Sequence, residues 1–335
     1  MTKTHPASLP PGRRTALKAI GGAALAAAGG SVLAQGKWPE RTVRIVVPFS
    51  AGGTTDVVAR AIAQNFTEYW GQSVVVENRA GAGGNIGAEL VAKAAPDGYT
   101  ILMTSGSIFT VNPHMYSQLP FDPVKDFIAV TNVASGPQVV AVHPSVPAKT
   151  VGELIALAKS KPGSINFGSA GIGTQTHMAA ENFVTAAGIQ ATHIPYKGES
   201  AAIADLAAGS IHFVVSNIAA LIPYIGDKRV RALGVTSTKR STLIPDLPTV
   251  AEGGLKGFEN SGWFGFMVPA GTPQAVVDKI HRDTVKALDD TRLKARLHVA
   301  GMAPVGNAPK EFASAIAEES KLWAQVVKSR GLKVN

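Results

Sequence analysis

Two short turns combine glycines with hydroxyl side chains immediately before a helical segment. The first, PFSAGGTTD (48–56), follows the apolar run VRIVV, and the second, SAGIGTQT (169–176), follows INFG. Unpaired main-chain amides at a helix N-terminus carry partial positive charge, and glycine lets a ligand approach them closely. Ser and Thr hydroxyls add donors that can rotate toward a ligand. Both turns are therefore predicted to hold an anion.

The composition of the turns indicates which anion they hold. Neither turn contains Lys or Arg, and their glycine spacing matches neither the P-loop nor the dinucleotide fingerprint. Phosphate usually recruits a cation, so a carboxylate held by neutral donors fits these turns better. The alternative is that each turn only caps its helix, with Thr55 or Asp56 as the first cap. Because two matched copies occur, we favour a cleft in which both turns face one carboxylate ligand.

Other polar residues are weaker candidates for the same cleft. Ser105 ends a predicted strand, and YKGES (196–200) forms a third strand-to-helix turn. Asp56 could meet a ligand ammonium, although an acidic residue in the first turn of a helix commonly complements the helix dipole. His177 follows the second turn and could meet a carboxylate or serve a structural role.

The sequence contains no recognised catalytic or metal-binding motif. Because it contains no Cys, disulfides, thiolate metal sites and cysteine nucleophiles are excluded. The eight His residues show no metal-ligand spacing. We therefore expect no enzyme activity, no metal and no other cofactor. The remaining catalytic alternative is an exported serine hydrolase that uses Ser169 or Ser50 with His177.

Residues 1–34 are predicted to be an export signal. Two adjacent arginines (13 and 14) precede a short Ala-rich stretch that ends in the small-residue site VLA (32–34). The arginine pair favours the twin-arginine route, and the apolar stretch is too short and too rich in glycine for a membrane anchor. Removal of this segment lowers the net charge from +9 to +5, and no basic patch suggests nucleic-acid binding. We expect the mature protein in the periplasm.

From Lys37 onward, apolar strands alternate with amphipathic helices. This order predicts an α/β fold of mainly parallel sheets flanked by helices. About 300 residues exceed a usual single α/β core, so we expect two lobes, 37–135 with 258–335 and 136–257. The expected strands are 41–49, 72–79, 99–105, 127–135, 138–144, 165–170, 191–198, 211–217, 231–237 and 263–271. The expected helices are 56–70, 84–98, 150–163, 174–188, 199–210, 272–290 and 308–331.

Several segments resemble one known family. They include PFSAGGTTDVVAR, VENRAGAGGNIGAELVAKAAPDGYT, NFGSAGIGTQTHMAAENF and IPYKGESAAIADLAAG. In this order they resemble the Bug family, the TctC-like periplasmic receptors of tripartite tricarboxylate transporters. The resemblance implies a two-lobed Venus-flytrap fold of the type II periplasmic binding proteins, with a hinge of crossing strands. It also implies a monomer that captures a small organic carboxylate and delivers it to the membrane permease.

The resemblance also implies which residues contact the ligand. Glu199 stands where a small residue is expected, which leaves a purely anionic far end of the ligand in question. The family does not fix the ligand, since its members bind acidic amino acids, dicarboxylates, citrate-like acids or aromatic acids. The same fold could instead serve as a periplasmic sensor for a signalling kinase. The implied contacts are Phe49, Ser50, Ala51, Gly52, Thr54 and Thr55, then Ser169, Ala170, Gly171, Gly173, Thr174 and His177, and, at the far end, Tyr196, Lys197, Gly198, Glu199 and Ser200.

Overall fold

The computed structural model describes residues 1–4 and 38–333 of the chain. Apart from its first four residues, the predicted export signal therefore lies outside the described residues. Residues Met1–Glu40 and Arg41–Asn335 are separate units, and all elements below belong to the second unit. In the described ranges, no helix is both long enough and apolar enough to cross a membrane.

The strands of the described chain form one mixed sheet. Its main path runs β2-β1-β3-β9-β4-β7-β5-β6, and β8 and β10 both pair with β4. β1 is parallel to β2 and β3, and β5 is parallel to β6 and β7. β4 and β9 run antiparallel to their neighbours and join these two parallel parts. The strands are Val43–Val47 (β1), Val74–Asn78 (β2), Thr100–Ser105 (β3), Phe127–Val142 (β4), Asn166–Ser169 (β5), Thr192–Pro195 (β6), Phe213–Asn217 (β7), Arg231–Val235 (β8), Ser261–Pro269 (β9) and Ala303–Pro304 (β10).

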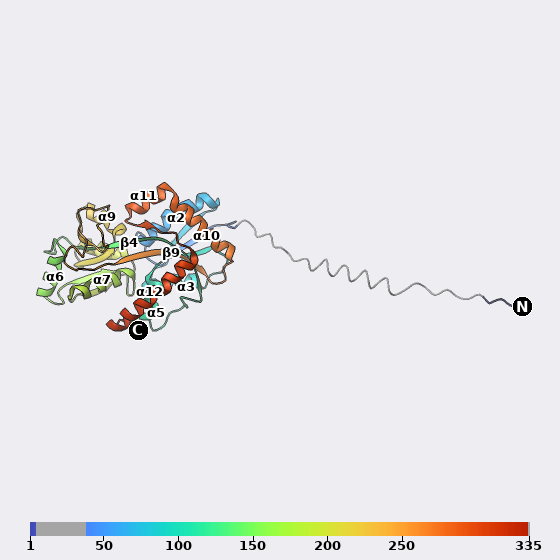
Figure 1. Cartoon of the computed structure of the whole chain (residues 1–335), viewed down its shortest axis with the longest axis horizontal. Coiled ribbons are helices and arrows are strands. Elements are labelled where there is room, and N and C mark those ends of the chain that lie inside the picture. Colours follow the sequence, from blue (N-terminus) through green and yellow to red (C-terminus); the bar gives the residue numbers. More distant parts are fainter. Residues whose placement is uncertain (5–37, 334–335) are drawn as a thin grey trace. The chain divides into compact units, whose positions relative to one another are not determined.

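Strand β4 is continuous where the sequence predicted a break. We expected two strands separated at Gly136-Pro137, but the structure has one strand of 16 residues, so that prediction was wrong. Residues 127–137 pair with β9, and residues 138–142 pair with β7 and β8. β4 and β9 run side by side through the middle of the fold (Figure 1). Because neighbouring strands pair along its whole length, β4 persists through a local Gly-Pro break signal.

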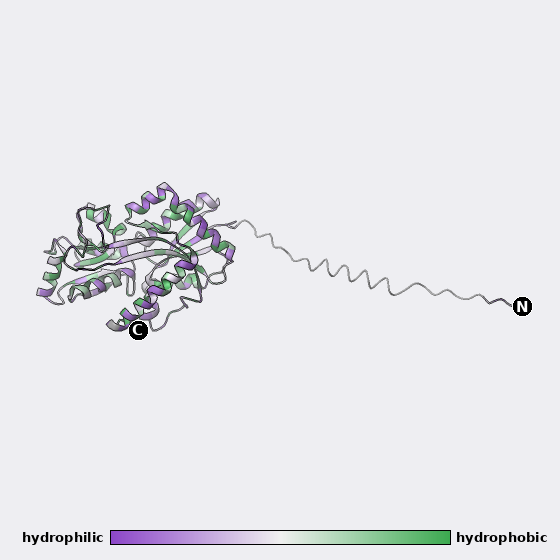
Figure 2. Cartoon of the chain, in the orientation of Figure 1, coloured by the Kyte–Doolittle hydropathy of each residue, from purple (hydrophilic) through white to green (hydrophobic). Residues whose placement is uncertain are grey.

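Helices cover the sheet and carry both polar and apolar residues, which appear as purple and green along the same ribbon (Figure 2). The sequence predicted two C-terminal helices, whereas the structure has three. The additional helix, α11, is capped by Asp290, whose carboxylate accepts from the main-chain N–H groups of Arg292 and Leu293 (2.8 and 3.0 Å). The helices are Thr54–Trp70 (α2), Asn85–Ala92 (α3), Ser107–Thr110 (α4), Asn112–Met115 (α5), Val151–Ser160 (α6), Gln175–Ala187 (α7), Glu199–Ala208 (α8), Ile218–Gly226 (α9), Gln274–Asp289 (α10), Thr291–Val299 (α11) and Pro309–Arg330 (α12), and a 3₁₀ turn spans Ala82–Gly84 (η1).

We refer to the elements around β1, β2, β3 and β9 as the first lobe and to those around β5–β8 as the second lobe. In the second lobe, alternate residues of β4 face opposite sides of the sheet. Val140 and Val142 join a core with α6 and α7, whereas Val139 and Ala141 join a core with α8 and α9. Strand β5 contributes Phe167 to the first of these cores, and Ile194 of strand β6 packs against the second. The helices therefore hold the ends of β5 and β6, where the second and third turns begin.

Candidate functional site

The first turn (48–56) joins β1 to α2 and is braced from within by Asp56. Asp56 Oδ2 accepts from Gly52 N (3.0 Å) and Arg60 Nε (2.9 Å), and Oδ1 accepts from Asn78 Nδ2 (2.9 Å). Burial raises the pKa of Asp56, but these hydrogen bonds and the Arg60 charge outweigh it, so the pKa lies below its ordinary value. Both oxygens of Asp56 are therefore used to hold the turn.

The amide end of α2 faces a carboxylate of the protein itself. Thr54 N donates to Glu199 Oε2 at 3.0 Å, and the N-cap residue, Gly53, has no side chain that could take this place. Glu199 Oε1 accepts from Ser216 Oγ (2.7 Å), Asn217 N (2.8 Å) and Asn217 Nδ2 (2.9 Å). Glu199 is only 6% exposed. Four donors thus hold one buried carboxylate at the positive end of α2.

The third turn (196–200) packs directly on the first turn. Ser50 Oγ donates to the Lys197 carbonyl (3.1 Å), and Ser200 Oγ donates to the Ala51 carbonyl (3.0 Å). A Cβ at Gly198 would lie 2.7–2.9 Å from three atoms of Ser50, which is too close for any side chain. Glycine at position 198 is therefore required for this contact between the lobes.

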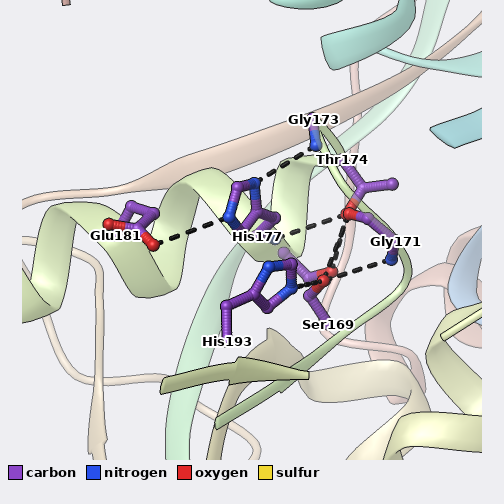
Figure 3. A network of polar contacts seen from close by, with 8 residues as sticks. Ser169, Gly171, Gly173, Thr174, His177, Glu181 and His193 are labelled. Carbon is purple, nitrogen blue, oxygen red and sulfur yellow. Dashed lines mark hydrogen bonds and ion pairs between the residues drawn. The ribbon is translucent and has the colours of Figure 1, made fainter. Parts of the chain in front are cut away.

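The second turn (169–176) is satisfied by its own side chains. Thr176 Oγ1 accepts from Ala170 N (2.9 Å), and Ser169 Oγ accepts from Gly171 N (3.1 Å). Thr174, the N-cap of α7, donates from its hydroxyl to the Gly171 carbonyl at 2.6 Å (Figure 3). These bonds hold the turn from within, and Tyr116 of the first lobe adds one more from its hydroxyl to the Ile172 carbonyl (3.1 Å).

His177 supports the second turn from behind. Gly173 N donates to His177 Nδ1 (3.2 Å), so the proton of a neutral ring lies on Nε2, which is 3.5 Å from Glu181 Oε1 (Figure 3). The His177 ring stacks on His193 with a centroid separation of 3.9 Å. Both ring nitrogens of His177 therefore face groups of the second lobe.

His193 completes this network through Ser169. His193 Nε2 lies 2.6 Å from Ser169 Oγ (Figure 3). The His193 ring also stacks on Phe167. Burial, with a smaller contribution from the charge of His177, lowers the pKa of His193 to about 3. His193 is therefore neutral at ordinary pH.

The first and second turns line one narrow cavity. Its volume is about 330 Å³. The free space between the side chains is enough for about one water molecule. The lining residues are Phe49, Gly53, Thr54, Thr55, Ser105, Ala170, Thr174, Gln175, Thr176, Glu199, Asn217 and Phe264.

Three of the lining side chains carry buried polar atoms that have no partner in the described part of the chain. They are Thr54 Oγ1, Asn217 Oδ1 and both amide atoms of Gln175. Thr54 and Asn217 are only 1% and 3% exposed. Buried polar groups are almost always hydrogen-bonded in proteins, so these unpaired atoms make the cavity a candidate binding site.

A wider groove of about 1160 Å³ lies on the second lobe and contains none of the turn residues. Its Arg231 donates to the carbonyls of Pro144, Val146 and Ala148, so the guanidinium is already used. The narrow cavity, where the unpaired atoms gather, is therefore the better candidate site.

Comparison with known proteins identifies the family. The model of the tripartite tricarboxylate transporter family receptor, TctC, matches residues 58–332. The chain belongs to this receptor family. Among its relatives, protein BugT of Bordetella pertussis is 35% identical over 322 residues, which cover 96% of this chain and 99% of BugT. The predicted resemblance to the Bug family is confirmed.

Solved structures of TctC-like receptors share the fold of this chain. The periplasmic binding protein BugD matches with a TM-score of 0.85 and 35% identity, over 88% of this chain and 99% of its own. R. palustris Rpa4515 with adipate matches with a TM-score of 0.85 and 36% identity, over 88% of this chain and 98% of its own. MatC from Rhodopseudomonas palustris with bound malate matches with a TM-score of 0.82 and 31% identity, over 87% of this chain and 100% of its own. The receptor therefore has the two-lobed fold of the periplasmic binding proteins, as predicted.

The structure places the predicted site residues of this receptor in two groups. Those that line the cavity are Phe49, Thr54, Thr55, Ser105, Ala170, Thr174 and Glu199. Those that lie outside its lining, and shape the turns or join them, are Ser50, Ala51, Gly52, Asp56, Ser169, Gly171, Gly173, His177, Tyr196, Lys197, Gly198 and Ser200.

Five residues that line the cavity were not among the implied contacts: Gly53, Gln175, Thr176, Asn217 and Phe264. The first three lie within the first and second turns, which the sequence did single out, and Gln175 is also the first residue of α7. Asn217 is the last residue of β7, and a polar residue at the carboxyl end of a parallel strand could have been suspected. Phe264 lies on β9, far along the chain, and only the tertiary structure brings it to the turns.

Proposed function

We propose that this receptor captures a small organic carboxylate in the cavity between its first and second turns. The observation that carries this proposal is the set of unpaired buried atoms of Thr54, Gln175 and Asn217, which gather between two helix N-termini. Amides at helix ends suit an anion held by neutral donors. The related structures with adipate and malate support a carboxylate as the ligand class.

Ligand capture in this proposal depends on movement of two lobes, formed by residues 37–135 with 258–335 and by residues 136–257. The pairing of β4 supports this division, because its partner changes from β9 to β7 after residue 137. The ligand contacts both lobes only when they are closed, so it stabilises the closed state by differential contacts. β4 and β9 would supply the hinge.

Transport is the proposed purpose of ligand capture. The family match supports delivery of the ligand to the membrane permease of a tripartite tricarboxylate transporter. The export signal proposed for residues 1–34 would place the mature protein in the periplasm, where we expect it to act as a monomer. We propose no catalysis, since Ser169 also bonds within its own turn and neither Ser169 nor His193 lines the cavity.

Thermal-shift screening of the purified protein against carboxylates tests the proposed function. A ligand at 100 times its dissociation constant adds about 2.7 kcal/mol and raises the melting temperature by several degrees. Thr54→Val should abolish most of this shift without lowering the melting temperature of the free protein, because the hydroxyl it removes is unpaired. Binding of sugars or cations, but of no carboxylate, would contradict the proposal.

A further inference from the structure

We propose that Glu199 selects the ligand class: an acid with one carboxylate and, at its other end, a hydrogen-bond donor such as an ammonium. This inference rests on the proposed function, because it assigns the two ends of a ligand in the turn cavity. The N-terminus of α2, one of the two positive helix ends at the cavity, already has a carboxylate of the protein as its partner. Glu199 Oε2 lies on Thr54 N, at the start of α2.

The charge of Glu199 is not balanced by a basic side chain. All four of its donors, from Thr54, Ser216 and Asn217, are neutral groups. A second carboxylate placed beside it would bring two like charges together where water is largely excluded. A ligand ammonium would instead compensate the buried charge. Dicarboxylates are therefore disfavoured at this end of the cavity.

The neighbouring side chain also presents an acceptor at this end. Asn217 Nδ2 donates to Glu199 Oε1, a carboxylate oxygen that can only accept from it. This bond fixes the orientation of the Asn217 amide, so its unpaired Oδ1 is an acceptor. Asn217 Oδ1 thus lacks a donor, which the ligand can supply, and the buried negative charge of Glu199 favours a donor that is positively charged.

The other end of the cavity remains suited to a carboxylate. α7 starts with Gln175 and has no acidic residue in its first turn, unlike α2 with Asp56 and α8 with Glu199. Gln175, the first residue of this helix, lines the cavity, and its amide has an unpaired donor, Nε2, and an unpaired acceptor, Oε1. The single carboxylate of the ligand therefore binds at the second turn, and the donor group points to Glu199.

Matched ligands test this inference. β-Alanine and malonate have equal numbers of carbon atoms, as do γ-aminobutyrate and succinate, and ε-aminocaproate and adipate. Each pair differs only in whether the far end is an ammonium or a carboxylate. For at least one pair, calorimetric titration should show that the unmodified protein binds the amino acid at least tenfold more tightly.

Two variants separate selection by Glu199 from a simple contact between the lobes. Glu199→Gln keeps the size of the side chain and removes its charge, so it should lower the preference for the ammonium at least tenfold. Ser200→Ala removes the neighbouring bond to the Ala51 carbonyl without altering the charge in the cavity. It should weaken both members of a pair equally. Melting curves of both variants establish that they fold.

Each outcome decides between clear alternatives. Equal or tighter binding of the dicarboxylates by the unmodified protein would overturn the inference while supporting the proposed function. An unchanged preference in Glu199→Gln would reduce Glu199 to a contact between the lobes. If no acid of any kind binds, the proposed function itself fails.

Discussion

The first and second turns have nearly the same residue types, yet different parts of the protein satisfy their polar groups. In the second turn, the side chains of Thr174, Thr176 and Ser169 bond to main-chain groups of the turn itself. At the first turn, the leading amide of α2 bonds to Glu199, which belongs to the second lobe. The second turn is thus held mainly by its own side chains, whereas the leading amide of α2 is bonded to a residue of the other lobe.

In the proposed mechanism, this difference gives the two turns different tasks. The second turn would provide a fixed site for the ligand carboxylate at little cost in conformational entropy. The first turn would connect ligand recognition to lobe closure, because Glu199, the partner of its helix, belongs to the other lobe. Substitutions should therefore affect binding at the contact between the first and third turns and stability within the second turn.

The largest expected effect is on binding, from Gly198→Ala. The added Cβ would lie 2.7–2.9 Å from Ser50, so the first and third turns could not meet. Overpacking of this kind costs about 1–3 kcal/mol, which corresponds to roughly fivefold to 150-fold weaker ligand binding. Gly226→Ala is the matched control, since no atom lies within 4 Å of its added Cβ. Calorimetry on any ligand found by thermal shift measures both, and equal affinities would contradict our account of closure.

The next effect is on folding stability, from Thr176→Val in the second turn. This change leaves the buried amide of Ala170 without its acceptor, which costs about 1–3 kcal/mol of the free energy of unfolding. Thr55→Val in the first turn is the matched comparison and should change stability by less than about 0.5 kcal/mol, with its loss confined to ligand binding. Urea unfolding of both variants provides the measurement. Equal destabilisation would mean that the turns do not differ in the proposed way.

The last expected effect is a difference in pH dependence between the two turns. The pKa of His193 is about 3 in the folded protein and about 6.5 when unfolded, so the unfolded chain binds more protons between these values. Stability should therefore fall as the pH drops from 6.5 toward 3. His193→Gln should make the melting temperature nearly independent of pH over the upper part of this window.

Asp56→Asn, in the first turn, is the comparison for this experiment. The pKa of Asp56 is held below its ordinary value of 3.8, so the stabilisation it provides is complete above that value and lost only in stronger acid. The substitution should therefore lower the melting temperature equally at pH 7 and pH 5. A slope between pH 6.5 and 4 that persists in His193→Gln would assign the acid sensitivity to another group.

Local patterns predicted most elements and both turns. The cap of α6 illustrates why: Thr150 accepts from Glu153 N at 3.1 Å, a contact made within four residues of sequence. Helix α9 was not predicted, because it is a short apolar segment with Pro223 inside it, and proline is unfavourable in the interior of a helix. The roles of Asp56 and His177 also differ from the simplest prediction, since both are bonded to groups within their own lobes.

By itself, the sequence determined the alternation of strands and helices, the two glycine-rich turns and the family to which the chain belongs. These features depend on residues close together in the chain, whose spacing fixes helix starts and strand ends. Only the tertiary structure decided which anion meets α2, because Glu199 lies 145 positions from Thr54. It also decided that Gln175, Asn217 and Phe264 line the cavity. Such contacts arise from strand pairing and lobe closure, and no local pattern encodes them.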